Sequence, residues 1–554
     1  RNKWGIHMGL RFLLGRAGTG KSGRALDEIK QKSIQEPQGP TIIYLVPDQM
    51  TFQQEYGLFY SEELQGSIRT QVMSFSRLAW VILQEVGGAT RPFISSMGTQ
   101  MMLRKIINEK QSEWSIFQKA IEKQGFLEEI ESLISEFKRY NITPEDLKRQ
   151  IDTLDRFVHK EAHEVTLMHK LNDLVFIYDQ LVQQLQGKYV DAEDRLQLFA
   201  KQIKDSTYLQ DAEIYIDGFY RFTPQELLVI EAMLKKCKQV TVLLTLDEPD
   251  KPDLSELDLF YQTSETYHTL KDMAHTLNIP IDDVIVLEPK HGKFKENPAF
   301  LHLEAHFNQR PTPVFTGDVP IQIAEAVHPR AEVEGVAQEI NRLVRDENFR
   351  FKDMAIFIRE PDVYHDLITT VFEDYQIPVF IDEKRTMLNH PLIEFLRSLL
   401  DVVEGDWRYD AVFRLLKTGF IPASDSEYPL TDDAIDELEN YVLEYGIRTR
   451  KKWLDDQDWI FQRFQGFEQA VQTDSDLEKQ EKINRYRQQI KQALGNFDHR
   501  IREAHTVRDC CEILYQLLET LKVPEQLEEQ RQQFEERGEN QKAREQEQVW
   551  DESI

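Results

Sequence analysis

The sequence predicts an α/β fold with two parallel-sheet units, each interrupted by a largely helical insertion. Short apolar, β-branched runs that end at Pro, Asp or Gly are typical of buried parallel strands. Between these runs, apolar residues recur every three or four positions, as in amphipathic helices. The predicted strands are 10–14, 41–46, 213–217 and 240–244 in the first unit and 321–324, 354–358 and 377–381 in the second.

The remaining elements follow in order along the chain. Strand 10–14 runs into a glycine loop and then a helix from Ser22, and helical spacing over 126–137 and 167–177 indicates a helical insertion. A proline-containing stretch over 290–318 is expected to connect the two units. The spacing predicts a helix over 333–344 and helical structure from 388 onward. The Glu/Gln/Arg-rich residues 525–554 favour a solvated helix or a frayed tail.

Composition excludes several classes of protein. Acidic residues outnumber basic residues by 96 to 67 in 554 residues, so the net charge is −29 and bulk electrostatics would repel nucleic acid. Any DNA contact must therefore come from a local surface. No apolar run approaches the ~18 residues of a membrane span. Three cysteines exclude a disulfide framework and favour a reducing, cytoplasmic compartment. Met8 is the expected native start.

The loop after the first strand carries the most specific motif. GRAGTGKS fits G-x-x-x-x-G-K-[ST] in full, between a predicted strand and a predicted helix. In such loops, backbone N–H groups surround phosphate oxygens, the lysine reaches the terminal phosphates and the hydroxyl ligates Mg²⁺. The motif predicts an ATP–Mg²⁺ site made by Gly15, Arg16, Ala17, Gly18, Thr19, Gly20, Lys21 and Ser22.

A second Mg²⁺ ligand is expected at the end of a neighbouring strand. Asp217, after Ile214-Tyr215-Ile216, fits this role. Hydrolysis usually also needs a Glu beside that Asp, but the next residue is Gly218. Asp247-Glu248 could substitute, or it could be an ordinary strand-end turn. The sequence therefore supports ATP binding better than ATP hydrolysis.

Several further segments resemble one known family. They are GRAGTGKS (15–22), LVPDQMTFQQE (45–55), SFSRLAW (74–80), EFKRY (136–140), YIDGFYRFTPQE (215–226), NHPLIEF (389–395) and DWRYDAVFRLLKTGF (406–420). In this order, they resemble the B subunit of bacterial AddAB helicase–nucleases, relatives of RecBCD. The resemblance covers most of the chain from Met8 onward.

The resemblance implies a superfamily-one helicase architecture with two RecA-like P-loop domains. It places the first RecA-like domain at 8–95 and 206–290, around a helical insertion at 96–205. A connector at 291–318 leads to the second RecA-like domain at 319–387. A second helical insertion follows at 388–554, and we expect the chain to be a fragment that ends before the rest of this domain and the nuclease domain.

The resemblance also implies partners and cofactors. The family acts as a heterodimer with an AddA-like motor subunit, on double- and single-stranded DNA, in the repair of double-strand breaks, and the B subunit scans the 3′-terminated strand for the Chi sequence. Its members carry a 4Fe–4S cluster on four cysteines in a C-terminal nuclease domain. This chain has only Cys237, Cys510 and Cys511, so it holds no ligand set for that cluster.

Departures from an active helicase shape the functional expectation. A glutamine motif upstream of the loop is missing, and the later arginine motif would lie beyond Ile554. Arg359 sits where such helicases place a γ-phosphate-sensing arginine, although a salt-bridged surface arginine is the alternative. A helicase-like subunit that is not the motor fits best. The competing possibilities are a self-sufficient DNA translocase and, less well supported, a small-substrate P-loop enzyme.

Three loops that follow strands combine aromatic residues with amides, hydroxyls and arginines. Ligands of open parallel sheets bind beyond the carboxyl ends of the strands, and single strands are held by stacking and read through hydrogen bonds to base edges. Phe75 and Trp80 could instead belong to the core. The predicted DNA-binding residues, which the resemblance connects to Chi, are Gln49, Thr51, Phe75, Arg77, Trp80 and Phe219.

Two other patterns carry little. His302 and His306 are four residues apart, but the zinc-protease motif needs Glu directly after the first His. We therefore expect residues 302–306 to form a surface helix. Cys510-Cys511 is expected to be a pair of half-buried thiols.

Overall fold

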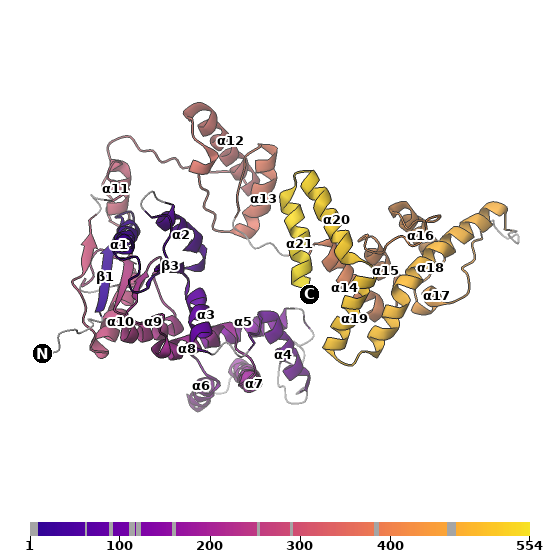
Figure 1. Ribbon diagram of the computed structural model, residues 1–554, viewed down its shortest axis with the longest axis horizontal. Helices are drawn as coiled ribbons and strands as arrows, with labels where there is room; N and C mark the ends of the chain where they lie inside the picture. Colours follow the sequence, from indigo (N-terminus) through magenta and orange to yellow (C-terminus); the bar gives the residue numbers. More distant parts are fainter. Residues whose placement is uncertain are drawn as a thin grey trace. The chain divides into compact units, whose positions relative to one another are not determined.

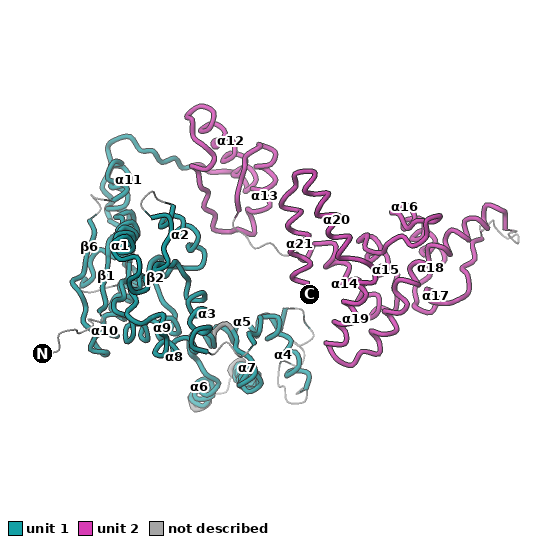
Figure 2. Tube along the Cα trace, in the orientation of Figure 1, with its two compact units in different colours: residues 1–323 teal, residues 324–554 magenta. Residues whose placement is uncertain are grey.

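The structure is a computed structural model that describes residues 9–553, except 61–63, 88–91, 110–116, 118–122, 124, 158–161, 252–254, 289–291, 382–386 and 463–471. Met8, the predicted start, lies outside the described residues. The chain divides into two compact units, residues 1–323 and 324–554 (Figure 2). None of the described helices is long and apolar enough to cross a membrane.

A six-stranded sheet forms the centre of the first unit (Figure 1). Its order is β3-β2-β4-β5-β1-β6, and every pairing is parallel. The four strands predicted in this unit are confirmed, and two short strands join them at the edges. The strands are β1 (Gly9–Gly15), β2 (Ile42–Leu45), β3 (Thr70–Met73), β4 (Glu213–Ile216), β5 (Gln239–Thr245) and β6 (Ile285–Leu287).

Helices cover both faces of this sheet, as the apolar strands require. Successive side chains of a strand point to opposite faces, so Leu13 packs on one side and Phe12 and Leu14 on the other. The first face is covered by α1 (Lys21–Gln35) and α2 (Thr51–Phe59). The second is covered by α3 (Phe75–Val86), α8 (Ala192–Gln202), α9 (Pro224–Lys236) and α10 (Tyr261–Thr276).

The predicted helical insertion has its own small core. Its helices are α4 (Ser96–Glu109), α5 (Phe126–Arg139), α6 (Pro144–Phe157) and α7 (Ala162–Leu185). The buried ammonium group of Lys138 at the end of α5 pairs with Asp191 and with Asp194, the latter at 3.0 Å. Its carbonyl accepts a 2.7 Å hydrogen bond from Gln225 of α9. These bonds attach the insertion to the helices that cover the sheet.

The second unit is helical in the part that the structure describes. Two helices, α12 (Pro329–Glu347) and α13 (Pro361–Asp374), share one small core. A larger core joins eight further helices. These are α14 (Pro391–Glu404), α15 (Tyr409–Leu416), α16 (Asp432–Glu444), α17 (Arg450–Leu454), α18 (Asp474–Glu503), α19 (Val507–Thr520), α20 (Val523–Glu536) and α21 (Asn540–Ser553).

Two expectations for this unit need correction. The C-terminal residues are helical, but Leu527 and Val549 are buried in the larger core, so α20 and α21 are packed rather than frayed. Residues 321–324, 354–358 and 377–381 were expected to be strands. Within the described residues they join no sheet, and Phe357 and Phe380 are 95% and 90% exposed. The backbone N–H and C=O groups of a strand need a hydrogen-bonded partner strand, and these segments have no such partner among the described residues.

Glu213, at the start of β4, allows a test of the ion pairs at the amino-terminal end of the strands. Its buried carboxylate pairs with Lys32 of α1 and, at 2.8 Å, with Lys238. Burial alone would raise the pKa of Glu213, but the two ammonium groups hold that pKa below the ordinary 4.5. Glu213→Gln should lower the free energy of unfolding by about 1–3 kcal/mol at neutral pH.

Because the carboxylate is favoured in the folded state, its contribution is complete above pH ~4.5 and is lost as the pH falls below that value. Denaturant titrations at several pH values measure the difference between variant and wild type. Glu231→Gln is the matched control, since its ion pair with Lys235 is half exposed and should change stability by less than about 0.5 kcal/mol. A difference that grows towards acid pH would contradict the assignment.

Candidate nucleotide site and nucleic-acid interface

The loop between β1 and α1 combines positive-φ glycines with a helix start, as phosphate loops do. Gly15, Gly18 and Gly20 have φ values of +155°, +75° and +90°, which side-chain-bearing residues rarely adopt. Gly20 precedes the first turn of α1, so the loop ends at a helix N-terminus whose N–H groups and dipole favour an anion.

Lys21 is held within this loop. Its ammonium group donates to the carbonyls of Gly15 and Arg16 at 2.8 and 2.9 Å, and the Thr19 hydroxyl donates to the same Arg16 carbonyl. Burial lowers the pKa of Lys21, while Asp217 and Glu304 oppose that shift. The amine therefore already lies along the loop where a phosphate would be held.

A segment far along the sequence closes over the loop. The Lys293 N–H donates to the Gly18 carbonyl at 2.8 Å. A Cβ atom on Gly18 would lie 2.4 Å from the Phe294 ring, and one on Gly292 would lie 2.0 Å from the Gly18 carbonyl oxygen. We call residues 292–294 the loop cap. Both glycines are needed for this backbone approach.

Arg16 fastens the next part of that segment. Its guanidinium donates to Asp247 after β5 at 2.8 Å and to Glu304 at 2.7 Å, and it lies over the Phe260 ring. Glu304 belongs to α11 (Pro298–His306), which is the predicted surface helix. The first half of the predicted connector is therefore part of the nucleotide site's surroundings.

The predicted magnesium ligands lie beside one hydroxyl. The Tyr44 hydroxyl donates to the Asp217 carboxylate at 2.5 Å, and the Ser22 side chain lies near the same Tyr44 hydroxyl. The second oxygen of Asp217 accepts the Gly218 N–H at 2.8 Å. Ser22 and Asp217 thus share a neighbour, as two ligands of one ion would. The described residues contain no cluster of three His, Cys, Asp or Glu side chains suited to a metal ion.

A side chain at position 218 would be crowded and its backbone strained. Gly218 has a φ of +83°, and a Cβ atom there would lie 2.8 Å from the Met50 sulfur and 3.0 Å from Pro47. A glutamate cannot occupy the position beside Asp217 without moving the loop that follows β2. Of the possible substitute pair Asp247-Glu248, Asp247 is engaged by Arg16 and Glu248 is exposed.

The three predicted DNA loops meet at one edge of the sheet. The Gly218 backbone lies against Met50 of the loop after β2, and the rings of Phe219 and Phe75 are 5.5 Å apart. The loops after β2, β3 and β4 therefore form one surface, beyond the carboxyl ends of three adjacent strands.

The predicted DNA-binding residues differ in exposure. Gln49 and Arg77 are exposed, Trp80 is 49% exposed, and Thr51 is half-buried with its hydroxyl bonded to the Asp48 carbonyl. Phe219 is half-buried. Phe75 is only 5% exposed and belongs to the core between sheet and helices. It can support the surface but presents little area to a base.

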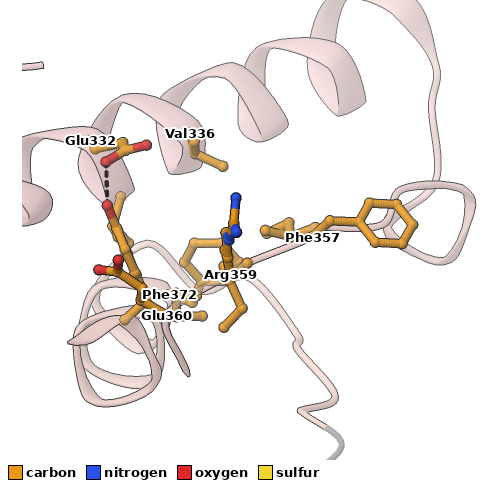
Figure 3. A pocket seen from close by; sticks show the side chains of 11 residues that line it. Glu332, Val336, Phe357, Arg359, Glu360 and Phe372 are labelled. Atoms are coloured by element: carbon orange, nitrogen blue, oxygen red, sulfur yellow. Dashed lines mark hydrogen bonds between the residues drawn. The ribbon is translucent and has the colours of Figure 1, made fainter. Parts of the chain in front are cut away.

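Arg359, predicted to sense a phosphate, lies in the second unit. Its side chain reaches towards α12 in a cavity of about 410 Å³ that α12, α13 and residues 356–360 line, while the Phe357 ring points away (Figure 3). Glu332 in the same cavity accepts a 2.7 Å hydrogen bond from Tyr364. Arg359 is exposed and makes no ion pair with the residues that the structure describes.

Sequence patterns missed four residues around the loop: Tyr44, Gly292, Phe294 and Glu304. Tyr44 stood inside an apolar strand, where its hydroxyl gave no signal. Gly292 and Phe294 lie almost 280 residues from the loop and match no motif. Gly292, a lone glycine two residues before an aromatic residue, could have suggested a close backbone approach. The sequence does not indicate which other segment it would approach.

These features place the chain in the parallel α/β class with a P-loop sequence motif. A sequence profile described as "ADDB, N-terminal" matches residues 12–304. The chain is 56% identical over 98% of its length to the B subunit of the "ATP-dependent helicase/deoxyribonuclease" of Oceanobacillus iheyensis, covering 47% of that protein. It is 44% identical to the protein of the same description from Bacillus mycoides and 45% to that from Bacillus cereus strain B4264, covering 46% of each.

The chain belongs to the AddB family. It spans about half the length of these relatives. The resemblance derived from the sequence motifs is therefore confirmed.

Alanine substitutions at three glycines of the loop region distinguish the cost of backbone strain from the cost of a clash with Phe294. Gly18→Ala should destabilise the fold by about 1–2 kcal/mol through strain at positive φ and by about 1–3 kcal/mol more through the clash with Phe294. Gly20→Ala should cost only the first amount, because nothing lies within 4 Å of a Cβ there. Denaturant titration measures all three variants.

Gly23→Ala is the control. Gly23 lies in α1 with open space around it, so alanine should be neutral or stabilise by up to about 1 kcal/mol. Equal effects of Gly18→Ala and Gly20→Ala would show that Phe294 does not close over the loop in solution.

Proposed function

We propose that this chain is the helicase-like part of the B subunit of an ATP-dependent helicase/exonuclease complex that processes double-strand DNA breaks for recombinational repair. It binds ATP–Mg²⁺ and the 3′-terminated single strand and recognises Chi, and it is not the motor. The relatives share one description, the B subunit of an ATP-dependent helicase/deoxyribonuclease, which supports the complex and the need for a second subunit.

One observation supports the proposal that the chain binds ATP but is not the motor. The phosphate loop is complete, yet the position beside Asp217 is Gly218, where a side chain would be strained by the positive φ and crowded by Met50 and Pro47. General-base activation of water needs a group within hydrogen-bond reach, and this position cannot supply one. A site that holds ATP without turning it over fits a scaffold or a sensor better than a motor.

The residues that would hold the nucleotide are those of the loop, Gly15 to Ser22. Loop N–H groups and Lys21 would bind phosphate oxygens, and Ser22 and Asp217, joined through Tyr44, would ligate Mg²⁺. Bound Mg²⁺ would neutralise phosphate charge. Arg359 is proposed to approach the same phosphates in the assembled subunit.

DNA is proposed to lie across the loops after β2, β3 and β4. Exposed Trp80 and half-buried Phe219 would stack bases, and Gln49, Thr51 and Arg77 would contact base edges. Phe75 would support Phe219 from beneath. An amide, a hydroxyl and a guanidinium on one surface suit the reading of sequence as well as the holding of a strand.

The remaining parts of the proposal concern the whole subunit. Residues 319–387 would belong to a second RecA-like domain, supported by the alternation of α12 and α13 with the apolar segments 321–324, 354–358 and 377–381. The nuclease domain with its 4Fe–4S cluster and the AddA-like motor subunit would lie outside this chain.

The nucleotide proposal is tested by titration and turnover. The chain should bind ATP–Mg²⁺ at equilibrium and hydrolyse it far below the ~10 s⁻¹ typical of enzymes. Lys21→Ala should abolish binding because it removes the only loop amine. Lys30→Ala, on the same helix, should bind normally. Turnover of several per second by the isolated chain, lost in Lys21→Ala, would instead favour a self-sufficient translocase.

The DNA proposal is tested in the assembled complex. With Arg77→Ala or Gln49→Ala, unwinding of Chi-free and Chi-containing duplexes should stay normal, while the Chi-dependent change in degradation is reduced or lost. Each direct base contact contributes about 1–3 kcal/mol of discrimination. Gln53→Ala, an exposed glutamine of α2, is the control. Equally slowed unwinding of both duplexes, with the Chi response intact, would identify a sequence-independent strand track.

A further inference from the structure

A groove runs between α8 and α9 on the first unit, away from the predicted DNA loops. It encloses about 800 Å³ and is lined by residues of both helices together with Lys204 and, from the turn after α5, Asn141 and Thr143. The two helices are labelled in Figure 1. On α9 the lining residues are spaced as on one helical face, beginning at Leu228 and ending at Lys236. On α8 the same spacing leads from Gln197 towards Lys201.

The floor of the groove is apolar and shallow. Ala200 of α8 and Ala232 of α9 both line it, and Leu228, which also lines it, is 41% exposed. Small side chains let a third helix approach to the usual 8–10 Å between axes. An exposed leucine beside two alanines is a contact for apolar side chains rather than for phosphate groups.

One end of the groove is basic. Lys201 and Lys204 lie on one side and Lys235 and Lys236 on the other. Glu231 is the one acidic residue of the lining, and it pairs with Lys235. The Lys236 ammonium group donates to the Lys204 carbonyl at 3.1 Å, which joins the two rims. In a chain of net charge −29, this concentration of lysines stands out.

The position of the lysines separates them from the proposed DNA surface. The helix α9 starts after the β4 loop at the carboxyl edge of the sheet and ends just before β5 at the opposite edge. Its 13 residues span about 20 Å. The basic end of the groove therefore lies a helix length from Phe219 and its neighbours.

We propose that the α8–α9 groove docks an acidic amphipathic helix of the partner subunit. The apolar floor would bury the helix's apolar stripe, and the four lysines would face carboxylates at one of its ends. Charge complementarity selects this occupant: most of the chain's surface repels an acidic partner, so the groove is the favoured place for it. This inference rests on the proposed function, since it assumes a second subunit.

Photocrosslinking in the assembled complex identifies the occupant directly. With Leu228 replaced by p-benzoylphenylalanine, irradiation should join this chain to the partner subunit, at a peptide with Asp or Glu at helical spacing. Crosslinks to DNA, crosslinks within the subunit, or none at all would overturn the proposal.

Charge reversal supplies the second measurement. Lys201→Glu together with Lys235→Glu should weaken binding of the purified partner subunit about tenfold or more at low salt, with a smaller difference at high salt. Both side chains are exposed, so thermal melting should be unchanged. Lys451→Glu together with Lys452→Glu, an exposed pair in the second unit, is the matched control.

Unchanged affinity of the groove variant, or an equal loss in the control, would overturn the proposal. ATP binding and the Chi response are measured on other surfaces of the chain. They report on the proposed function even if the groove proves unoccupied.

Discussion

The close approach of two backbones at Gly18 is the constraint on which the nucleotide site depends. The Gly18 carbonyl accepts the Lys293 N–H, and the Phe294 ring fills the space that a side chain of residue 18 would need. This contact brings a segment almost 280 residues away onto the phosphate loop. Through Arg16, α11 is fastened to the same place.

If a nucleotide binds as proposed, the contact would link the occupied loop to the chain beyond it. The N–H groups of the loop must face the phosphates, while the Gly18 carbonyl is held by the loop cap on its other side. A change in the loop's conformation on binding would therefore strain or release the bond to Lys293. The cap leads through α11 towards residue 323, the end of the first unit, so this segment is well placed to transmit whether the site is filled.

A second crowded backbone position limits the chemistry. Gly218 lies between Asp217 and the aromatic residues of the DNA loops, and the loop after β2 packs directly on it. The same packing brings Gln49 and Phe219 onto one surface and crowds any side chain beside Asp217. Convergence of the three loops and loss of the usual catalytic position are thus two consequences of one contact.

Much of the first unit could be predicted from the sequence because its strands are buried on both faces. Apolar four-residue runs such as Ile42–Leu45 have no polar face to turn towards solvent, so they must occupy a central position in the sheet. The phosphate loop was equally clear, because its function fixes both residue types and spacing. The loop cap was not predictable, since it depends on a long-range approach that leaves no local periodicity.

The second unit shows the opposite case. Residues 354–358 have the composition of a buried strand, yet among the described residues they have no ladder partner and Phe357 is exposed. Local composition reports the environment a segment requires, whereas strand formation depends on a neighbour. Phe75 illustrates the same limit within the site: its place in the motif suggested a base contact, but burial gives it a supporting position.

The overall charge favours sequence-specific binding over non-specific binding of DNA at the proposed DNA surface. Non-specific affinity for DNA comes mainly from phosphate neutralisation and counterion release, and a chain of net charge −29 supplies little of either. Stacking on Trp80 and Phe219 and hydrogen bonds from Gln49 and Arg77 would then make up a larger share of the binding free energy. Because base-edge contacts distinguish sequences and phosphate contacts do not, weak general attraction raises the ratio of specific to non-specific binding. The proposed function requires that ratio, since it assigns sequence reading to this subunit and DNA movement to its partner.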